Sequence, residues 1–174
     1  PLYEQFKEDI ENAKYVLSTQ KIEATTAVTK TFGHYANTKY AELFRMDYDN
    51  IESINNNAGH YSNAVIGKAV DGNLDTYWET NKGNTSTFSN EVEVTFKDLV
   101  TLDRVMYGAR KSDRKGFAEE FEIYASQTSQ GDTYQLLATG QHIMEAGLIE
   151  AKFAPTTFKR IKFKFKKSNQ NWAT

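Results

Sequence analysis

The run from Arg160 to Lys166 alternates strictly between basic and apolar side chains. Its apolar members are Ile161, Phe163 and Phe165, and its basic members are Arg160, Lys162, Lys164 and Lys166. A period of two places the two kinds on opposite faces of a β-strand, whereas an amphipathic helix needs apolar residues three and four apart. One face can then pack on a core while the other meets solvent, as in antiparallel sheets. The run therefore predicts a strand of an antiparallel sheet.

Similar alternating runs recur along the chain after residue 50. They are Val92, Val94 and Phe96, then Val105, Tyr107 and Ala109, then Phe121, Ile123 and Ala125, and the segments 134–138 and 149–153. Short clusters rich in Gly, Asn, Asp and Ser separate these runs, which is typical of sandwiches and barrels built from antiparallel strands. Residues 51–174 are therefore predicted to form one all-β domain.

The first 50 residues follow a different pattern. Apolar residues recur at helical spacing, with charged residues between them, at Leu2, Phe6, Ile10, Ala13 and Leu17. This spacing predicts an amphipathic helix over residues 2–18. No clear period follows up to residue 49. We therefore divide the chain into a helical or irregular N-terminal extension, residues 1–50, and a β-sandwich, residues 51–174.

Length and composition limit the function classes. A chain of 174 residues can bury one ordinary core, and a formal net charge of −2 argues against a general nucleic-acid binder. The lack of cysteine excludes disulfides, thiolate zinc sites and a cysteine nucleophile. No run of about 18 apolar residues is present, so no membrane span is predicted. Because the sequence starts at Pro1 rather than Met, we expect a piece of a longer protein.

The segment from Asp71 to Trp78 places oxygen donors in a tight turn before two aromatic residues. Carboxylate, amide and hydroxyl oxygens, the hard ligands that Ca2+ prefers, come from Asp71, Asn73, Asp75 and Thr76. The segment departs from a helix-loop-helix calcium site, because Thr76 and Lys82 stand where such a site needs Gly and Glu. A solvated turn rich in Asp and Asn is the alternative interpretation. Trp78 is predicted to lie in the core beneath the turn.

The sequence shows no catalytic constellation. His34, His60 and His142 are far apart, and there is no HExxH zinc motif, GxSxG nucleophile turn or glycine-rich phosphate loop. Glu119 and Glu120 are adjacent on a predicted strand, so their carboxylates point to opposite faces rather than flanking one substrate. We therefore predict a domain that is not itself an enzyme.

Four motifs after residue 50 carry a family resemblance by their order and spacing. They are Lys68-Ala69-Val70-Asp71-Gly72-Asn73, Thr76-Tyr77-Trp78, Arg104-Val105-Met106-Tyr107-Gly108-Ala109-Arg110 and Phe121-Glu122-Ile123-Tyr124-Ala125-Ser126. This set resembles the discoidin domain, also called the coagulation factor 5/8 (F5/8) type C domain. It more closely resembles the family 32 carbohydrate-binding modules of secreted bacterial enzymes that degrade glycans or mucins. The resemblance implies an antiparallel jelly-roll sandwich, also described as galactose-binding-domain-like, with bound Ca2+ and a glycan site on the loops at one end.

The resemblance also implies which residues hold the calcium ion. Carried over by position, the ligands are the carbonyl of Lys68, the carboxylate of Asp71, the carbonyl of Asn73 and the carbonyl or hydroxyl of Thr76. A further acidic ligand is expected beyond Thr174. Ca2+ is therefore the one cofactor that we expect.

Sugar-binding positions follow from the same resemblance. Family members that bind galactose use His, Arg, Asn and an aromatic residue, and the matching positions here hold Glu79, Arg110, Lys115 and Trp172. Only the Arg is retained among the polar positions, so the identity of the sugar does not carry over. Planar donors and an aromatic ring suit the hydroxyl edges and the C–H face of a sugar. The alternatives are an ion pair of Arg110 with Asp113 or Glu79, and packing of Trp172 at the edge of the core.

The basic face of the strand from Arg160 to Lys166 has two interpretations. Alternating Lys side chains keep a solvent-facing or edge strand soluble and block pairing with other sheets, which is the interpretation we favour. The alternative is a surface that binds sulfated glycans or anionic membranes.

We therefore predict a non-catalytic carbohydrate-binding module that targets a larger secreted bacterial enzyme to host or mucin-type glycans. The expected partners are a glycan that contains galactose or N-acetylhexosamine and the neighbouring domains of the parent enzyme, outside the cell or at its surface. The alternatives are a discoidin-like structural or protein-interaction module without a working sugar site, and a binder of anionic polymers or membranes.

Overall fold

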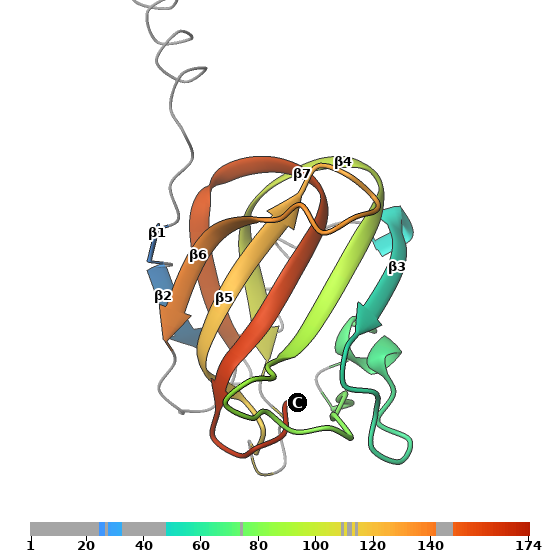
Figure 1. Ribbon diagram of the computed structural model, residues 1–174, viewed down its shortest axis with the longest axis vertical. Coiled ribbons are helices and arrows are strands. Elements are labelled where there is room, and N and C mark those ends of the chain that lie inside the picture. The colour runs from blue at the N-terminus through green and yellow to red at the C-terminus, as the bar shows by residue number, and fades with distance from the viewer. Residues whose placement is uncertain are drawn as a thin grey trace, which may run out of the picture.

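Figure 1 shows a layered β structure in which many of the loops gather at the end that holds the C-terminus. The computed structural model describes residues 25–26, 28–32, 48–73, 75–108, 110, 113, 115–141 and 148–174. The helix predicted over residues 2–18 lies outside these residues. Within the described ranges, no helix is long and apolar enough to cross a membrane.

Seven strands and two short 3-10 helices make up the regular structure of the described residues. The strands are β1 (Thr25–Thr26), β2 (Val28–Phe32), β3 (Ile51–Asn56), β4 (Asn90–Gly108), β5 (Ala118–Ser126), β6 (Gln135–Gln141) and β7 (Leu148–Ser168), and the helices are η1 (Tyr48–Asn50) and η2 (Ile66–Ala69). All pairs are antiparallel except β1 with β6. The all-β antiparallel class predicted from the alternating runs is confirmed.

β4 and β7 are long strands that pair with each other and bend together. Figure 1 shows both of them curving over at the end opposite the C-terminus. The ladder between them shifts register between Thr95 and Val100, and again near Pro155 of β7. Register shifts bend strands, and proline has no N–H to donate to a neighbouring strand. The predicted strands at 149–153 and 161–165 are therefore two halves of one bent strand.

The bends place the two halves of β4 and β7 in different layers. The front layer in Figure 1 contains β3, the first half of β4, the second half of β7, β5, β6 and β1. The back layer contains the second half of β4, the first half of β7, and β2. β1 and β2 belong to the predicted N-terminal extension, so part of residues 1–50 adds strands to the sandwich. The predicted boundary between an N-terminal extension and the sandwich at residue 50 otherwise stays a prediction.

The core between the layers is dominated by aromatic rings. Trp78, Phe121, Phe158 and Phe165 are all buried, and Phe163 stacks on Phe121 with 5.0 Å between ring centroids. As predicted, Trp78 lies in the core, and Phe121, Ile123 and Ala125 are buried together. Phe121 also packs on Gly140, where an added Cβ would lie 2.2 Å from the ring. The absence of a side chain at that glycine lets β5 and β6 close over the ring.

β7 is a central strand, so the predicted edge position of its basic face is wrong, while Lys166 on that face is exposed to solvent as predicted. Its second half lies between β4 and β5. Arg160 is buried and lies 3.6 Å from Glu93. The Lys side chains pair with carboxylates on the neighbouring strands, Lys162 and Lys164 with Glu91 and Lys166 with Glu122. Because each positive charge faces a negative one across the sheet, this surface is a poor match for a polyanion.

Candidate functional site

Four segments meet at the end of the sandwich where the C-terminus lies, and we call this end the loop pole. They are residues 57–64, residues 77–89, the described residues 110, 113 and 115–117, and residues 169–174. Backbone hydrogen bonds join them: Tyr61 N donates to the Glu79 carbonyl at 2.8 Å, Asn84 N donates to the Asn171 carbonyl, and Thr174 N donates to the Gly116 carbonyl at 2.9 Å. Beneath them, the Trp78 indole donates to the Gly59 carbonyl at 3.2 Å. The loops therefore form one connected surface on the buried core.

Arg110 lies at the loop pole between two carboxylates. Its Nη1 donates to Glu79 Oε2 at 2.6 Å, while Nε and Nη2 donate to the two oxygens of Asp113 at 2.8 and 2.7 Å. The guanidinium carbon lies 4.8 Å above the centre of the Tyr77 ring. The Arg110 side chain is only 12% exposed and that of Glu79 14%. Both ion pairs that the sequence offered as alternatives for Arg110 are thus present at once.

The carboxylates fix the orientation of Arg110 without using all of its donors. A guanidinium has five N–H groups, and three of them bind Glu79 and Asp113. The hydrogen bonds from Arg110 hold the pKa of the Asp113 carboxyl below its ordinary value. Asp113 therefore stays ionised well below neutral pH. The Arg110 guanidinium is therefore held in one orientation with two N–H groups unused by the described residues, next to carboxylate oxygens of Glu79 and Asp113 that can accept further hydrogen bonds.

The other predicted sugar-binding residues lie on the same pole with different surroundings. Lys115 is exposed, and its Nζ lies 3.9 Å from Asp113 Oδ2. Trp172 is half-buried, and its indole nitrogen is buried without a hydrogen-bond partner among the described residues. The structure thus brings Glu79, Arg110 and Lys115 to one cluster through Asp113. The ligand role of Trp172 stays a prediction.

Two tyrosines at the pole were not singled out as ligand residues from the sequence. Tyr61 is 59% exposed and Tyr77 is 37% exposed, so both offer open aromatic surface at the pole, Tyr77 directly under Arg110. The turn that carries Tyr61 is held against Glu79 on both sides, since Glu79 N also donates to the Ala64 carbonyl at 3.2 Å. Ser62 in this turn has φ 51°, a rare conformation for a residue with a side chain. Neither tyrosine follows a strand or helix period that could have indicated its exposure.

The loop after η2 brings together oxygens of three of the four predicted calcium ligands, Asp71, Asn73 and Thr76. Thr76 Oγ1 lies 2.5 Å from Asp71 Oδ2 and 2.9 Å from the Asn73 carbonyl oxygen, and its one hydroxyl hydrogen can be donated to either. Gly72, with φ 74°, allows the turn between Asp71 and Asn73. Lys68 is half-buried within η2, immediately before the loop. The described residues contain no group of three or more His, Cys, Asp or Glu side chains placed to hold a metal, so carbonyl and hydroxyl oxygens would have to complete such a site.

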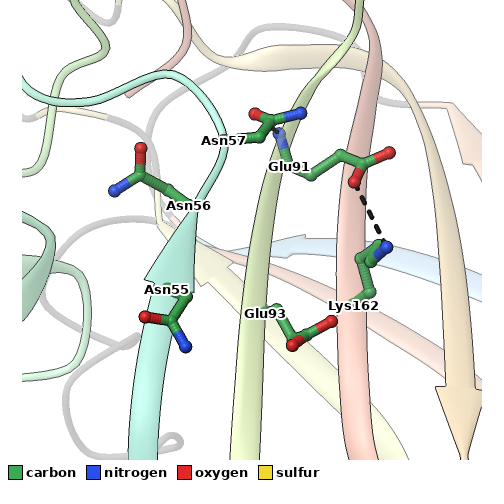
Figure 2. A pocket seen from close by; sticks show the side chains of 6 residues that line it. All are labelled: Asn55, Asn56, Asn57, Glu91, Glu93 and Lys162. Atoms are coloured by element: carbon green, nitrogen blue, oxygen red, sulfur yellow. Dashed lines mark hydrogen bonds and ion pairs between the residues drawn. The ribbon is translucent and has the colours of Figure 1, made fainter. Parts of the chain in front are cut away.

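A shallow hollow of about 150 Å³ lies on the outer face of the front layer, beside the edge of the pole at Asn57 (Figure 2). It is lined by Asn55, Asn56, Asn57, Glu91, Glu93 and Lys162. Lys162 Nζ lies 3.3 Å from Glu91, and the Tyr134 hydroxyl donates to Glu93. The Lys162 ammonium also lies 4.1 Å from the centre of the Tyr134 ring. The charged groups in this hollow satisfy one another, so the loop pole is the better candidate site.

Together, the fold and the pole define a jelly-roll β-sandwich with its candidate site on loops. The F5/8 type C domain model matches residues 50–174. The chain therefore belongs to the F5/8 type C domain family, and the predicted resemblance is confirmed. A comparison with curated protein sequences gave no match.

Solved structures from Clostridium perfringens are similar to almost the whole chain. The CBM32-1 and CBM32-2 domains of ZmpB are 54% identical over 99% of this chain and 45% of theirs, with a TM-score of 0.82. The same domains in complex with GalNAc are 53% identical over 99% of this chain and 43% of theirs, with a TM-score of 0.80. A longer ZmpB structure that includes the M60 catalytic domain is 54% identical over 99% of this chain and 18% of its own, also with a TM-score of 0.82. The chain thus spans less than half of each of these structures.

Proposed function

We propose that the chain is a non-catalytic family 32 carbohydrate-binding module whose loop pole binds terminal galactose-type sugars, with N-acetylgalactosamine as the first candidate. One observation carries the proposal: Arg110 is fixed between Glu79 and Asp113 above Tyr77. The candidate sugar is supported by the relative of 53% identity whose structure is a complex with GalNAc.

The chemistry of the pole suits the edge of a pyranose ring. Each sugar hydroxyl both donates and accepts, so neighbouring hydroxyls can accept from the remaining N–H groups of Arg110 and donate to Glu79. Hydrogen bonds to charged groups are stronger than neutral ones, which compensates for a shallow site. The exposed ring of Tyr61 offers an apolar surface for the C–H face of the sugar.

A shallow site on surface loops is expected to bind a single sugar weakly. A Kd of order 0.1–1 mM corresponds to roughly −4 to −5.5 kcal/mol. Several modules on one protein raise the avidity without new contacts, and one of the similar ZmpB structures contains two CBM32 domains together with an M60 catalytic domain. We propose that this chain likewise targets a larger secreted bacterial enzyme to host or mucin-type glycans.

The direct test is a titration of the isotope-labelled chain with GalNAc, galactose and glucose, followed by nuclear magnetic resonance. We expect saturable shifts with GalNAc at millimolar concentration in residues of the loop pole, Tyr61, Tyr77, Glu79 and Arg110 among them. Glucose is the control sugar, since it differs from galactose only in the orientation of one hydroxyl. Equal and unsaturated responses to all three sugars, or shifts outside the pole, would rule out the proposed site.

We further propose that the loop after η2 holds a structural Ca2+. The oxygens of Asp71, Asn73 and Thr76 lie close together and are of the hard type that Ca2+ binds, so these residues fit the ion. When bound, the ion would supply rigidity rather than chemistry to the sugar site. Lys68 is the fourth predicted ligand, through its carbonyl.

Removal of calcium is expected to lower the melting temperature. An ion at 100 times its Kd that binds only the folded chain adds about 2.7 kcal/mol, which corresponds to a shift of roughly 5–10 °C for a chain of this size. Calorimetry with calcium and with a chelator measures this shift. Asp71→Asn should abolish the calcium response, whereas Asp98→Asn at the opposite end should keep it. Identical melting curves with and without calcium would contradict the proposed site.

A further inference from the structure

The two carboxylates that hold Arg110 belong to a closed ring of contacts. On the outer side of the pole, Arg110 joins Glu79 to Asp113. On the inner side, residues 169–174 join the same two loops, because Ala173 pairs with Thr80 and Thr174 pairs with Lys115. Thr80 follows Glu79 directly, and Lys115 N donates to Asp113 Oδ1 at 3.1 Å. The ring therefore connects the candidate ligand groups to the carboxyl-terminal segment.

The inner half of the ring consists of hydrogen bonds made by three buried residues, Thr80, Ala173 and Thr174. Thr80 N donates to the Ala173 carbonyl and Ala173 N donates to Thr80 Oγ1, both at 3.0 Å. Thr174 Oγ1 donates to the Lys115 carbonyl at 2.7 Å, and its carbonyl accepts from the Tyr107 hydroxyl at 2.6 Å. A buried N–H that loses its acceptor is costly, so these bonds hold the segment in one position.

Two glycines leave the space that residues 169–174 need to pack closely against the loops. A Cβ on Gly83 would lie 2.6 Å from the Asn171 carbonyl oxygen, and a Cβ on Gly116 would lie 2.9 Å from Thr174. Gly116 also has φ 83°, which favours glycine. A larger residue at either position would displace residues 169–174 from the loops. The sequence thus makes room for the segment on both sides of the ring.

We infer that residues 169–174 are a positioning segment that sets the separation of Glu79 and Asp113, and so the orientation of Arg110, through its hydrogen bonds to Thr80 and Lys115. This inference rests on the proposed function of the pole, and it assigns Thr80 as a positioning residue. Saccharide affinity and the attachment of the segment are then coupled, and the coupling is reciprocal: a ligand that needs the closed ring must also stabilise the segment.

The test replaces Thr80 with Val, which keeps the shape and removes the acceptor for Ala173 N. Thr156→Val is the matched control, since Thr156 is also buried and donates to a backbone carbonyl at 2.8 Å, but in the bend of β7. We expect Thr80→Val to weaken GalNAc binding at least threefold at a temperature where both variants are folded. Thr156→Val should bind like the unchanged chain, and Thr80→Ser, which restores a hydroxyl, should recover most of the affinity.

Two further readouts separate positioning from general destabilisation. The Arg110 Nε–H resonance, recorded without sugar, should shift in Thr80→Val and not in Thr156→Val. Saturating GalNAc should slow hydrogen exchange at the Ala173 and Thr174 amides more than at core amides of β5. If Thr80→Val leaves the Arg110 resonance in place, the inference is overturned, whether or not sugar binds. If the unchanged chain fails to bind sugar but the resonance moves, the positioning role stands and the proposed function fails.

Discussion

Arg110→Ala is expected to weaken GalNAc binding by more than about tenfold. Hydrogen bonds to charged groups contribute about 1.5–3 kcal/mol each, and about 1.4 kcal/mol is a factor of ten in affinity. The substitution also leaves Glu79 and Asp113 facing each other without the cation between them, which disturbs the remaining ligand groups. Starting from a millimolar Kd, binding should become undetectable by titration calorimetry or on a glycan array.

Arg104→Ala is the matched control for this experiment. Arg104 also bridges two carboxylates, Asp103 and Glu150, but it lies in the back layer where β4 pairs with β7. Its loss should leave sugar affinity unchanged. Arg110→Lys should bind weakly as well, because an ammonium keeps the charge and loses the planar fork. Wild-type affinity in Arg110→Ala would show that the sugar binds elsewhere.

Phe121→Ala is expected to destabilise the fold by about 3–5 kcal/mol, the usual cost of truncating a buried Phe. Phe121 is 2% exposed, stacks on Phe163 and fills the space left by Gly140. The cavity cannot close easily, because Gly140 has no side chain to move into it. Urea unfolding should give a lower midpoint with an unchanged slope.

Glu120→Ala tests whether the loss of stability in Phe121→Ala is specific to a core residue. Glu120 precedes Phe121 on β5 and is exposed, so its truncation should change stability by no more than about 0.5 kcal/mol. A loss below about 1 kcal/mol in Phe121→Ala would mean that the two layers do not pack through this ring.

The strands that build the stable core also hold the loops of the weakly binding candidate site. Loops tolerate changes in sequence because they lie on the surface, but they bind with a defined geometry only when a rigid scaffold fixes their ends. Here the ends are β3, β4, β5 and β7, and the buried Trp78 supports the loops through its bond to Gly59. The backbone of the candidate site is therefore set by the same strands that make the core.

The local sequence was sufficient for the β class and for much of the core. Period-two alternation depends only on the geometry of a single strand, so Ile123 and Phe165 could be assigned to the inner face without knowing their neighbours. The family resemblance added Arg110 and Glu79 as candidate ligands. Their mutual ion pair was offered as an alternative interpretation and is present.

Other features needed the partners that only tertiary structure supplies. Alternation is the same in a central and an edge strand, which is why β7 was misplaced and why the burial of Arg160 against Glu93 was missed. Loop exposure has no period, so Tyr61 gave no signal.

The sequence by itself determined that residues after 50 form β-strands with one apolar face, because that property is encoded within each strand. Tertiary structure alone decided that β4 and β7 bend into both layers and that residues 169–174 join the loops that carry Glu79 and Asp113. Those features depend on contacts between residues far apart in the chain, such as Thr80 with Ala173, and no local pattern records such a contact.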